Sequence, residues 1–484
     1  MMRARSWAFA GAFVTLSACC AFAADAVSAY HNGPARSGAY VVPGLTLAAA
    51  RNLHNDAGFH AILDGHVYAQ PLFAHLSGGR PVLLVATESN VVAALDAKSG
   101  ATVWQRTVGA PVSRSALPCG NIDPDGITGT PVLDLPGRRI YFDALIQTQA
   151  GPRHLVYALS LDNGSTVSGY PLDVEKALEA FHAEFSSLTQ GERGALSLFG
   201  GKLYVPFGGN WGDCGTYRGT VVEIDPPSAK LTAVWQTRAN GGGIWAPGGL
   251  ASDGKSLFAV TGNTFDASQF AFGEAVVRLK TGLAPSSDPA DLFTPSDWKR
   301  LDEEDTDLGG TDALPLDPGG AARLIAFGKD GKAYLLDRNR LGGVGGALAV
   351  MGVSNHAIIT APAVLERGGK ALVAFASRGG GRCASENITM LTVGPKGLGV
   401  AWCAPFSGAG APIITTSNGS DDAIVWVTGA EGDNRLHGFD AASGKPVFAG
   451  GPAMPGLRHM GTLIVAEGRL YIAADGTVYA LAPR

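Results

Sequence analysis

The stretch Val82–Trp104 (VLLVATESNVVAALDAKSGATVW) decides the fold of this chain. An apolar run, Val82–Thr87, is followed after a short polar turn by a second apolar run, Val91–Leu95. The turn Asp96–Gly100 comes next, and a third run ends at Trp104. Short apolar runs bounded by Gly, Asn, Asp and Ser are typical of β-strands. The stretch therefore predicts consecutive strands of a small antiparallel sheet.

The same pattern recurs along the chain. Further copies lie near residues 127–170 and 358–405. The clearest other copies are Leu203–Val205 with Val221–Asp225 and Val234–Trp235, Leu257–Val260 with Ala275–Leu279, Leu324–Phe327 with Ala333–Asp337, Ile424–Val427 with Leu436–Asp440, and Leu470–Ile472 with Val478–Leu481. These make about eight repeats of about fifty residues, each too small to bury both faces of its sheet alone.

Radial stacking of such repeats predicts an all-β protein, an eight-bladed β-propeller of four-stranded antiparallel blades, with seven blades as the alternative. The last repeat stops after its third strand, so we expect an N-terminal segment near Phe59–Leu63 to complete it and close the ring. The predicted division is a signal peptide over residues 1–24, an N-terminal extension over 25–55 and the propeller over 56–484.

One insertion departs from the repeats. Val174, Leu178, Phe181 and Phe185 recur at helical spacing between the second and third repeats. Apolar periodicity of this kind marks contact with a core. We expect a short helix that covers a blade.

Composition narrows the classes of function. The chain has 484 residues, of which 46% are hydrophobic and 16% charged, with 67 Gly and 28 Pro. This is a turn-rich globular composition, not that of a disordered chain. The net charge of -5 and the lack of a basic run with interleaved aromatics argue against nucleic-acid binding.

The N-terminus has the order of a secretory signal, with Arg3 and Arg5 before an apolar run from Trp7 to Leu16. Ala21–Ala23 suits ordinary cleavage, whereas Leu16–Cys19 resembles a lipobox that would leave Cys19 lipid-anchored. No later segment has the length and apolarity of a transmembrane helix. We expect a periplasmic or secreted protein, with lipid anchoring through Cys19 as the alternative.

An exported protein favours disulfides among the cysteines that follow the signal region. Cys383 and Cys403 flank a predicted strand-turn-strand segment, so we pair them, and Cys119 with Cys214 then follows by elimination. Other pairings of the same cysteines remain open at this point.

The segment Leu95–Gly100 with Trp104 resembles the repeat of the pyrroloquinoline quinone (PQQ) propellers, and the resemblance covers nearly the whole mature chain. Cys119–Ile122 and Gly126–Pro131 look most like a group of exported bacterial proteins with such repeats. These repeats occur both in quinoprotein dehydrogenases and in non-catalytic outer-membrane assembly lipoproteins. The resemblance therefore implies the fold more strongly than the activity.

Four positions resemble the dehydrogenase site. The resemblance places Trp245 as the floor under the quinone and Lys329 on the quinone oxygens. It gives Asn263 and Asp307 as calcium ligands, with Asp307 also the general base that takes the alcohol proton. Turns also favour these residue types, and the acidic run Asp302–Asp307 is of the kind that often forms a solvated loop.

The chain also departs from the dehydrogenases. Asp213 stands near the place of a Glu that ligates the metal, and it would need a local shift to replace that Glu. Tyr68 stands where the family has a Glu that contacts the quinone. The family's adjacent-cysteine disulfide is missing, but a Cys119–Cys214 bridge would place a disulfide beside the same pocket.

The expected function is a periplasmic quinoprotein-like oxidoreductase that oxidises an alcohol or sugar with PQQ and Ca²⁺. The sequence has no Cys-x-x-Cys-His haem motif, so electrons would pass to an external acceptor such as a cytochrome c. Neither a Gly-x-Ser-x-Gly elbow nor a His-Glu-x-x-His motif occurs, and the phosphate-loop pattern at Gly249–Ser256 precedes a strand, not a helix. The alternative is a non-catalytic scaffold that binds protein or glycan in the cell envelope.

Overall fold

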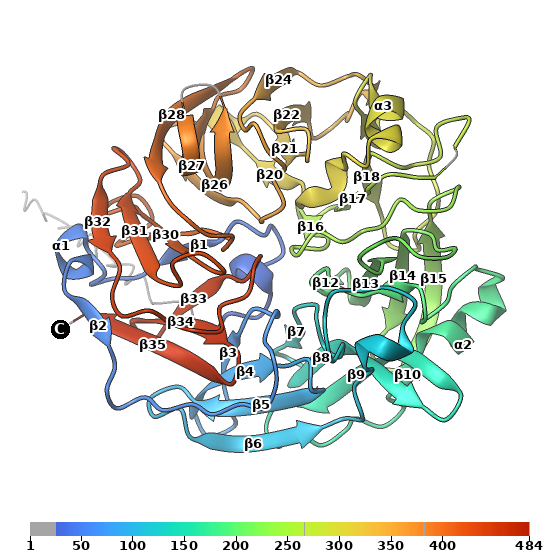
Figure 1. Ribbon diagram of the computed structural model, residues 1–484, viewed down its shortest axis with the longest axis horizontal. Coiled ribbons are helices and arrows are strands. Elements are labelled where there is room, and N and C mark those ends of the chain that lie inside the picture. Colours follow the sequence, from blue (N-terminus) through green and yellow to red (C-terminus); the bar gives the residue numbers. More distant parts are fainter. Residues whose placement is uncertain (1–25, 266, 381–382, 484) are drawn as a thin grey trace, which may run out of the picture.

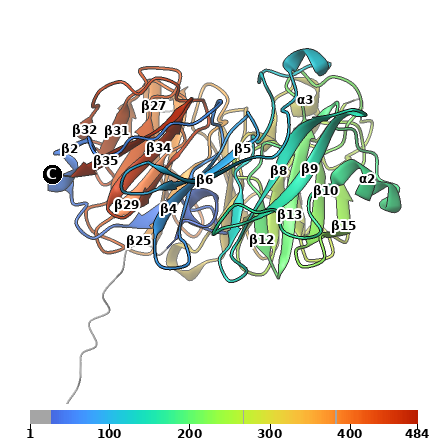
Figure 2. The same ribbon diagram turned by 90° about the horizontal axis from the view of Figure 1, so that it is seen from below.

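Within residues 26–265, 267–380 and 383–483, which this computed structural model describes, the repeats form eight β-sheets arranged as the blades of a ring (Figure 1). Seen edge-on, the ring is a disc whose strands run across its thickness (Figure 2). The prediction of an all-β, eight-bladed propeller is confirmed, and the seven-bladed alternative is wrong. The predicted signal peptide and Cys19 lie outside the described residues.

The first four blades follow one another along the chain. Blade 1 has β3 (Leu72–His75), β4 (Pro81–Ala86), β5 (Val91–Asp96) and β6 (Thr102–Thr107). Blade 2 has β7 (Val132–Asp134), β8 (Arg139–Thr148), β9 (Gly151–Ser160) and β10 (Leu172–Asp173). Blade 3 has β11 (Gln190–Gly191), β12 (Ser197–Phe199), β13 (Lys202–Gly209), β14 (Thr220–Asp225) and β15 (Lys230–Gln236). Blade 4 has β16 (Ala251–Ser252), β17 (Leu257–Val260), β18 (Val276–Leu279) and β19 (Leu292–Thr294), with β23 (Gly343–Val344) added in parallel.

The remaining blades repeat the arrangement. Blade 5 has β20 (Leu314–Leu316), β21 (Arg323–Phe327), β22 (Lys332–Asp337) and β24 (Ala349–Gly352). Blade 6 has β25 (Ala363–Arg367), β26 (Lys370–Gly380), β27 (Cys383–Val393) and β28 (Leu398–Pro405). Blade 7 has β29 (Ile413–Thr416), β30 (Ile424–Thr428), β31 (Leu436–Asp440) and β32 (Pro446–Ala449). Blade 8 has β33 (Leu463–Ala466), β34 (Arg469–Ala474) and β35 (Thr477–Pro483).

The core lies between neighbouring blades. One buried cluster joins Phe258 of blade 4 to Leu324 of blade 5, and the other blade interfaces are filled in the same way. The repeated tryptophan links the blades by a hydrogen bond, because the Trp104 indole N–H donates to the Leu161 carbonyl of blade 2 at 3.0 Å. A side chain at Gly164 would collide with that indole, so the glycine of the turn is needed for close packing.

The ring closes through β2 (Leu53–Asn55), which pairs antiparallel with β35. Closure by an N-terminal segment is thus confirmed, but the predicted segment, Phe59–Leu63, is wrong. Residues 59–63 form no strand; their backbone bonds instead to Ser99 and Gly476 on either side of the blade 8–blade 1 interface. The side chains of Phe59, Ala61 and Leu63 are buried there, although the apolar Ile62 between them is 82% exposed.

The N-terminal extension continues into the centre of the ring. Strand β1 (Ala39–Val41) adds in parallel to β29 of blade 7. Tyr30, in the short turn η1 (Tyr30–Asn32), packs against Ala195, Ala361 and Ala411, which come from three different blades. Arg36 is fully buried and donates to the Leu196 carbonyl at 2.8 Å. Residues 30–36 therefore fill part of the axial channel.

Helical segments are short. The predicted helix is present as α2 (Val174–Leu178), continued by η3 (Glu179–Phe181), and it lies on the outer rim with Val174 and Leu178 buried (Figure 1). The other helical segments are α1 (Leu47–Ala50), α3 (Trp298–Glu303), η2 (Arg114–Ala116), η4 (Leu308–Gly310) and η5 (Pro318–Gly320). Within the described part of the chain, no helix is long and apolar enough to cross a membrane.

Candidate functional site

A cavity of about 470 Å³ opens where connections from several blades converge. Two kinds of connection form its walls. One joins the second and third strands of a blade, and the other joins the last strand of a blade to the first strand of the next. Because the strands alternate in direction, both kinds of connection emerge on the same face of the ring. Asp213, Trp245, Asn263, Asp307 and Lys329 all line this cavity. The five candidate site residues, which span more than a hundred positions in the sequence, therefore lie in one place.

Trp245 forms part of one wall. The indole is half-buried, and the Lys329 Nζ lies over its ring at 5.4 Å from the centroid. This distance is within the range of a cation–π contact. Trp245 thus offers an aromatic face next to a fixed positive charge.

Asp307 is the most tightly held acid of the cavity. Its Oδ1 accepts the backbone N–H of Asn263 at 2.7 Å, and its Oδ2 lies 2.5 Å from the Lys329 Nζ. Gly262 allows this approach, since a side chain there would overlap with the Asp307 carboxylate. The Asp307 side chain is only 5% exposed, so the lysine interacts with it in a region of low dielectric.

Lys329 is held by both acids of its loop. Its Nζ also lies 3.1 Å from Asp305, whose side chain is 65% exposed. Burial lowers the pKa of Lys329, but the charges of Asp307 and Asp305 outweigh this effect and raise the pKa above its ordinary value. The ammonium therefore stays charged at neutral pH.

Glu274 lies behind this group. It is fully buried, and its Oε2 accepts the backbone N–H of Leu308, the residue after Asp307. Burial and the charge of Asp307 raise the pKa of Glu274 well above its ordinary value. This shift favours the neutral form of Glu274 beside the ion pair of Asp307 and Lys329.

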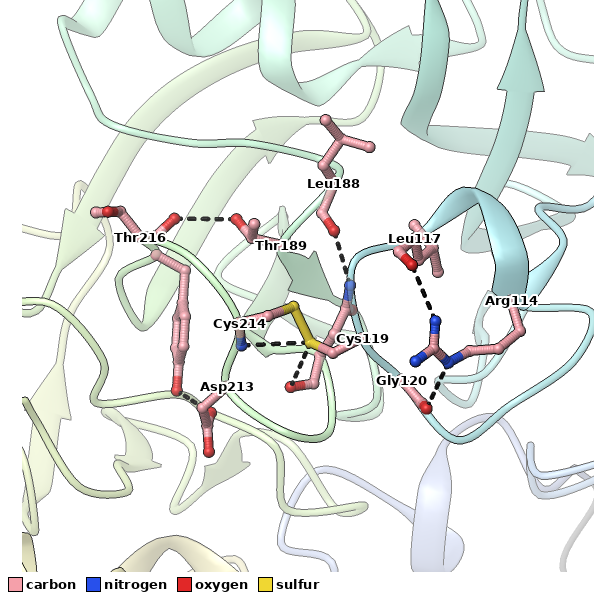
Figure 3. Close-up of a disulfide and its surroundings, with 11 residues drawn as sticks. Arg114, Leu117, Cys119, Gly120, Leu188, Thr189, Asp213, Cys214 and Thr216 are labelled. Atoms are coloured by element: carbon pink, nitrogen blue, oxygen red, sulfur yellow. Dashed lines mark hydrogen bonds between the residues drawn. A yellow bond between two sulfur atoms is a disulfide. The ribbon is translucent and has the colours of Figure 1, made fainter.

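Asp213 belongs to a loop that a disulfide fixes at the rim (Figure 3). Cys214 is bonded to Cys119, and the second disulfide joins Cys383 to Cys403, so both predicted pairings are present. The Tyr217 hydroxyl donates to Asp213 Oδ1 at 2.6 Å. Burial, followed by the charge of Asp307, raises the pKa of Asp213.

The disulfide joins two connections that both line the cavity. One carries Cys119 and Gly120 between blades 1 and 2, and the other carries Trp211 and Asp213 between β13 and β14. The Arg114 guanidinium braces the first connection through the carbonyls of Leu117 and Gly120, at 2.9 and 2.7 Å (Figure 3). This part of the rim is therefore tied down by a covalent bond and by hydrogen bonds.

Tyr68 does not line the cavity. Its ring packs edge-on against His459, which does, at 5.6 Å between centroids. The Arg458 guanidinium lies over the Tyr68 ring at 5.7 Å. Tyr68 therefore supports the wall of the cavity from behind.

Two of the three side chains predicted as calcium ligands, Asp307 and Asp213, are engaged with protein groups. Both oxygens of Asp307 are bonded, and Asp213 accepts the Tyr217 hydroxyl. Among the residues that the structure describes, no group of three or more His, Cys, Asp or Glu side chains is arranged to hold a metal ion. This arrangement does not fit a calcium ion.

The cavity does fit a planar, negatively charged quinone. Its volume is that of a small-molecule pocket, and Trp245 with Lys329 supplies an aromatic face and a cation. A flat aromatic ligand stacks on an indole, and an ammonium group stabilises negative charge on ligand oxygens.

Several cavity residues were missing from the sequence prediction. Asp125, Glu192 and Arg193 line the cavity beside Glu88, which lies behind them. The Glu88 Oε2 accepts the backbone N–H of Gly126 at 2.7 Å. These residues belong to no recognised motif. Only their position in a connection on the face where the cavity opens could have predicted that they line it. The exposed Trp211 at the rim, with 68% of its surface accessible, was also missing.

A buried ion pair adjoins these acids. His154 Nδ1 lies 2.5 Å from Asp143 Oδ2, and both side chains are almost wholly inaccessible. Burial lowers the pKa of His154, but the Asp143 carboxylate outweighs it, so the pKa is raised overall. This pair of polar side chains lies in the core between blades 2 and 3, where His154 also packs against Phe207.

Two comparisons at the level of sequence find no relative of this chain. No protein-family profile matches the chain. A comparison with curated protein sequences gives no significant match either.

Solved structures match over most of the chain. The quinohemoprotein alcohol dehydrogenase from Comamonas testosteroni is 15% identical with a TM-score of 0.68, covering 94% of this chain and 80% of its own. A europium-containing methanol dehydrogenase is 14% identical with a TM-score of 0.65, covering 93% of this chain and 90% of its own. BamB from Moraxella catarrhalis is 15% identical with a TM-score of 0.54, covering 89% of this chain and 99% of its own. The likeness is one of fold. At such identities it does not choose between an enzyme and a scaffold.

Proposed function

We propose that this chain is a periplasmic quinoprotein-like oxidoreductase that binds PQQ in the cavity and oxidises an alcohol or sugar. The observation that carries the proposal is the convergence of Trp245, Asp307 and Lys329, from connections of three successive blades, on one cavity. Each of these residues alone has an ordinary structural explanation, but a half-buried indole beside a lysine–carboxylate pair is a site with specific chemistry. The fold is compatible with this proposal, because alcohol and methanol dehydrogenases share it.

PQQ, when bound, supplies the oxidant. The Trp245 ring would hold its plane, and the Lys329 ammonium would stabilise negative charge on its oxygens. Asp307 would accept the proton of the substrate hydroxyl, as a general base held in place by the Asn263 N–H. Electrons would leave to a separate acceptor, for which a soluble cytochrome c is a candidate.

Calorimetric titration of the mature protein with PQQ, with and without calcium, tests the proposal. We expect saturable binding that weakens at least tenfold in Trp245→Ala and in Asp307→Asn. Trp298→Ala and Asp317→Asn change the same residue types outside the cavity lining, so they should bind PQQ as the wild type does. Reduction of a dye or of cytochrome c by an alcohol would then identify the substrate.

Failure of PQQ to bind under any of these conditions would overturn the proposal. The alternative is a propeller scaffold for protein or glycan in the cell envelope, with an anchor at Cys19. Mass spectrometry of the mature N-terminus would test that anchor directly.

A further inference from the structure

Arg193 is a cation in the lining of the cavity, and no acid of the described residues is bound to it. It follows β11 and is half-buried in the cavity wall. Among the residues described, no carboxylate lies within ion-pair distance of its guanidinium, whereas Lys329 is bound by two. Within the described part of the chain, its side chain makes one hydrogen bond, to the Met460 Sδ at 3.4 Å. A thioether is a weak acceptor, so it does not balance the charge.

Two acids lie near Arg193: burial raises the pKa of Asp125 only to about 6, so this carboxyl keeps negative charge at pH 7, but within the described part of the chain it forms no ion pair with the guanidinium. The carboxyls of Glu88 and Asp125 are close enough for the arginine charge to lower their pKa values. Burial has the larger effect, however, and raises the pKa of Glu88 to about 8. Glu88 is therefore mostly neutral at pH 7, and its Oε2 is used by Gly126 and Thr128.

One contact of the Arg193 side chain reaches across the ring. Met460 belongs to the connection between blades 7 and 8, so the arginine of blade 3 reaches a side chain on a distant part of the ring. The remaining guanidinium N–H groups stay available in the cavity. A guanidinium presents its donors in a planar fork that matches a carboxylate.

We propose that Arg193 is a carboxylate-binding group of the cavity, and that the small molecule bound there carries a carboxylate. A small hydroxy acid carries both a carboxylate for Arg193 and a hydroxyl whose proton Asp307 would accept. Small hydroxy acids are therefore the substrate class expected for the proposed oxidoreductase. This substrate class rests on the proposed function for the reaction, but not for the binding. PQQ also bears carboxylates, so the cofactor is the other source of the same chemistry.

Binding of matched probes to the protein without PQQ is the test. Glycerate and gluconate are compared with glycerol and glucose, their neutral counterparts, by calorimetry. We expect at least one acid to bind the wild type roughly 10- to 100-fold more tightly than its neutral counterpart, the range expected for a charge-assisted bidentate pair. Arg193→Gln should remove this preference, Arg193→Lys should keep part of it, and Arg51→Gln, an exposed arginine outside the cavity, should leave it unchanged.

Addition of PQQ then identifies the source of the carboxylate. If PQQ displaces the acid and loses affinity in Arg193→Gln, the arginine binds the cofactor; if both bind together, it binds the substrate. Either result supports carboxylate recognition by Arg193. Equal affinity for acids and neutral counterparts, or a preference that persists in Arg193→Gln, would overturn it. Because the first titrations contain no PQQ, failure of the cofactor to bind would not be confused with failure of this inference.

Discussion

Two acids bind Lys329 in very different surroundings. Asp307 is nearly inaccessible, whereas Asp305 is mostly exposed. Loss of the buried partner leaves a partly buried ammonium without compensation, while an exposed pair contributes little. We expect Asp307→Asn to lower the free energy of unfolding by about 2–3 kcal/mol, and Asp305→Asn by no more than about 1 kcal/mol. Urea unfolding at pH 7 measures both.

The pH dependence of this effect has a defined sign. The pKa of Lys329 is raised in the folded protein, so its stabilising contribution is present in full below the ordinary pKa of 10.5. The contribution is lost as the pH rises through the folded value. The difference between wild type and Asp307→Asn should therefore shrink above about pH 10.5. A difference that stays constant at high pH would show that the ion pair is not its cause.

Gly262 allows Asp307 to reach its place. A methyl group at position 262 would overlap with the Asp307 carboxylate, whereas one at Gly352 would meet open space. We expect Gly262→Ala to lower stability by about 1–3 kcal/mol and to weaken PQQ binding at least tenfold. Gly352→Ala should change stability by less than about 0.5 kcal/mol and leave binding intact. Thermal unfolding and the titration described above measure the two effects, and equal PQQ affinity in both variants would contradict the steric argument.

At this scale the sequence allows some residues to be predicted and not others. Trp245, Asn263, Asp307 and Lys329 stand in segments that resemble a known repeat, and the structure brings them together. Arg193 lies in a glycine-flanked connection without a motif. Its role depends on Met460, which is distant in sequence, and on acids whose protonation depends on burial. No local pattern encodes such contacts.

Among the elements, the two disulfides provide a matched pair. Cys119–Cys214 closes a separation of 95 residues at the cavity rim, and Cys383–Cys403 closes one of 20 residues within blade 6. Loss of a disulfide increases the chain entropy of the unfolded state. This lowers the free energy of unfolding by about 4–5 kcal/mol for the longer loop and by about 3 kcal/mol for the shorter. Replacement of each pair by serine should give these losses in stability. Only Cys119→Ser/Cys214→Ser should also weaken PQQ binding, which calorimetry measures; a similar loss in the blade 6 variant would disprove a specific role for the rim.

The closing strand shows why element boundaries are harder to predict than elements. In Leu53–Asn55 only Leu53 is buried, so the strand has almost no apolar pattern. Phe59–Leu63 has the pattern, but it fills the interface between blades and its backbone bonds to turns. Phe59, Ala61 and Leu63 thus fill the core without forming a strand, while strand pairing is set by the edge that β35 leaves open.

The molecule as a whole buries acids at the centre of its ring. Asp312 is fully buried near Arg36, and burial raises its pKa to about 7, although the arginine charge opposes this. The same cause raises the pKa of Glu88 to about 8 and that of Asp125 to about 6. Between about pH 5 and 8 the folded protein therefore binds protons that the unfolded chain has released. The contribution of these three acids to the free energy of unfolding should fall as the pH rises over this range.

Asp312→Asn isolates one of these groups. The amide has the shape of the protonated acid but does not titrate, so the variant should lose less stability than the wild type between pH 5 and 8. Between pH 5 and 8 the free energy of unfolding of the wild type should fall by on the order of 2–4 kcal/mol more than that of the variant, since the folded pKa of Asp312 lies well above the ordinary 3.8. Urea unfolding across the pH range measures it, with Asp317→Asn, an exposed acid, as the control that should follow the wild type. Parallel curves for Asp312→Asn and wild type would mean that Arg36 holds Asp312 ionised, and that the axial segment and the blades form a true ion pair at the centre of the ring.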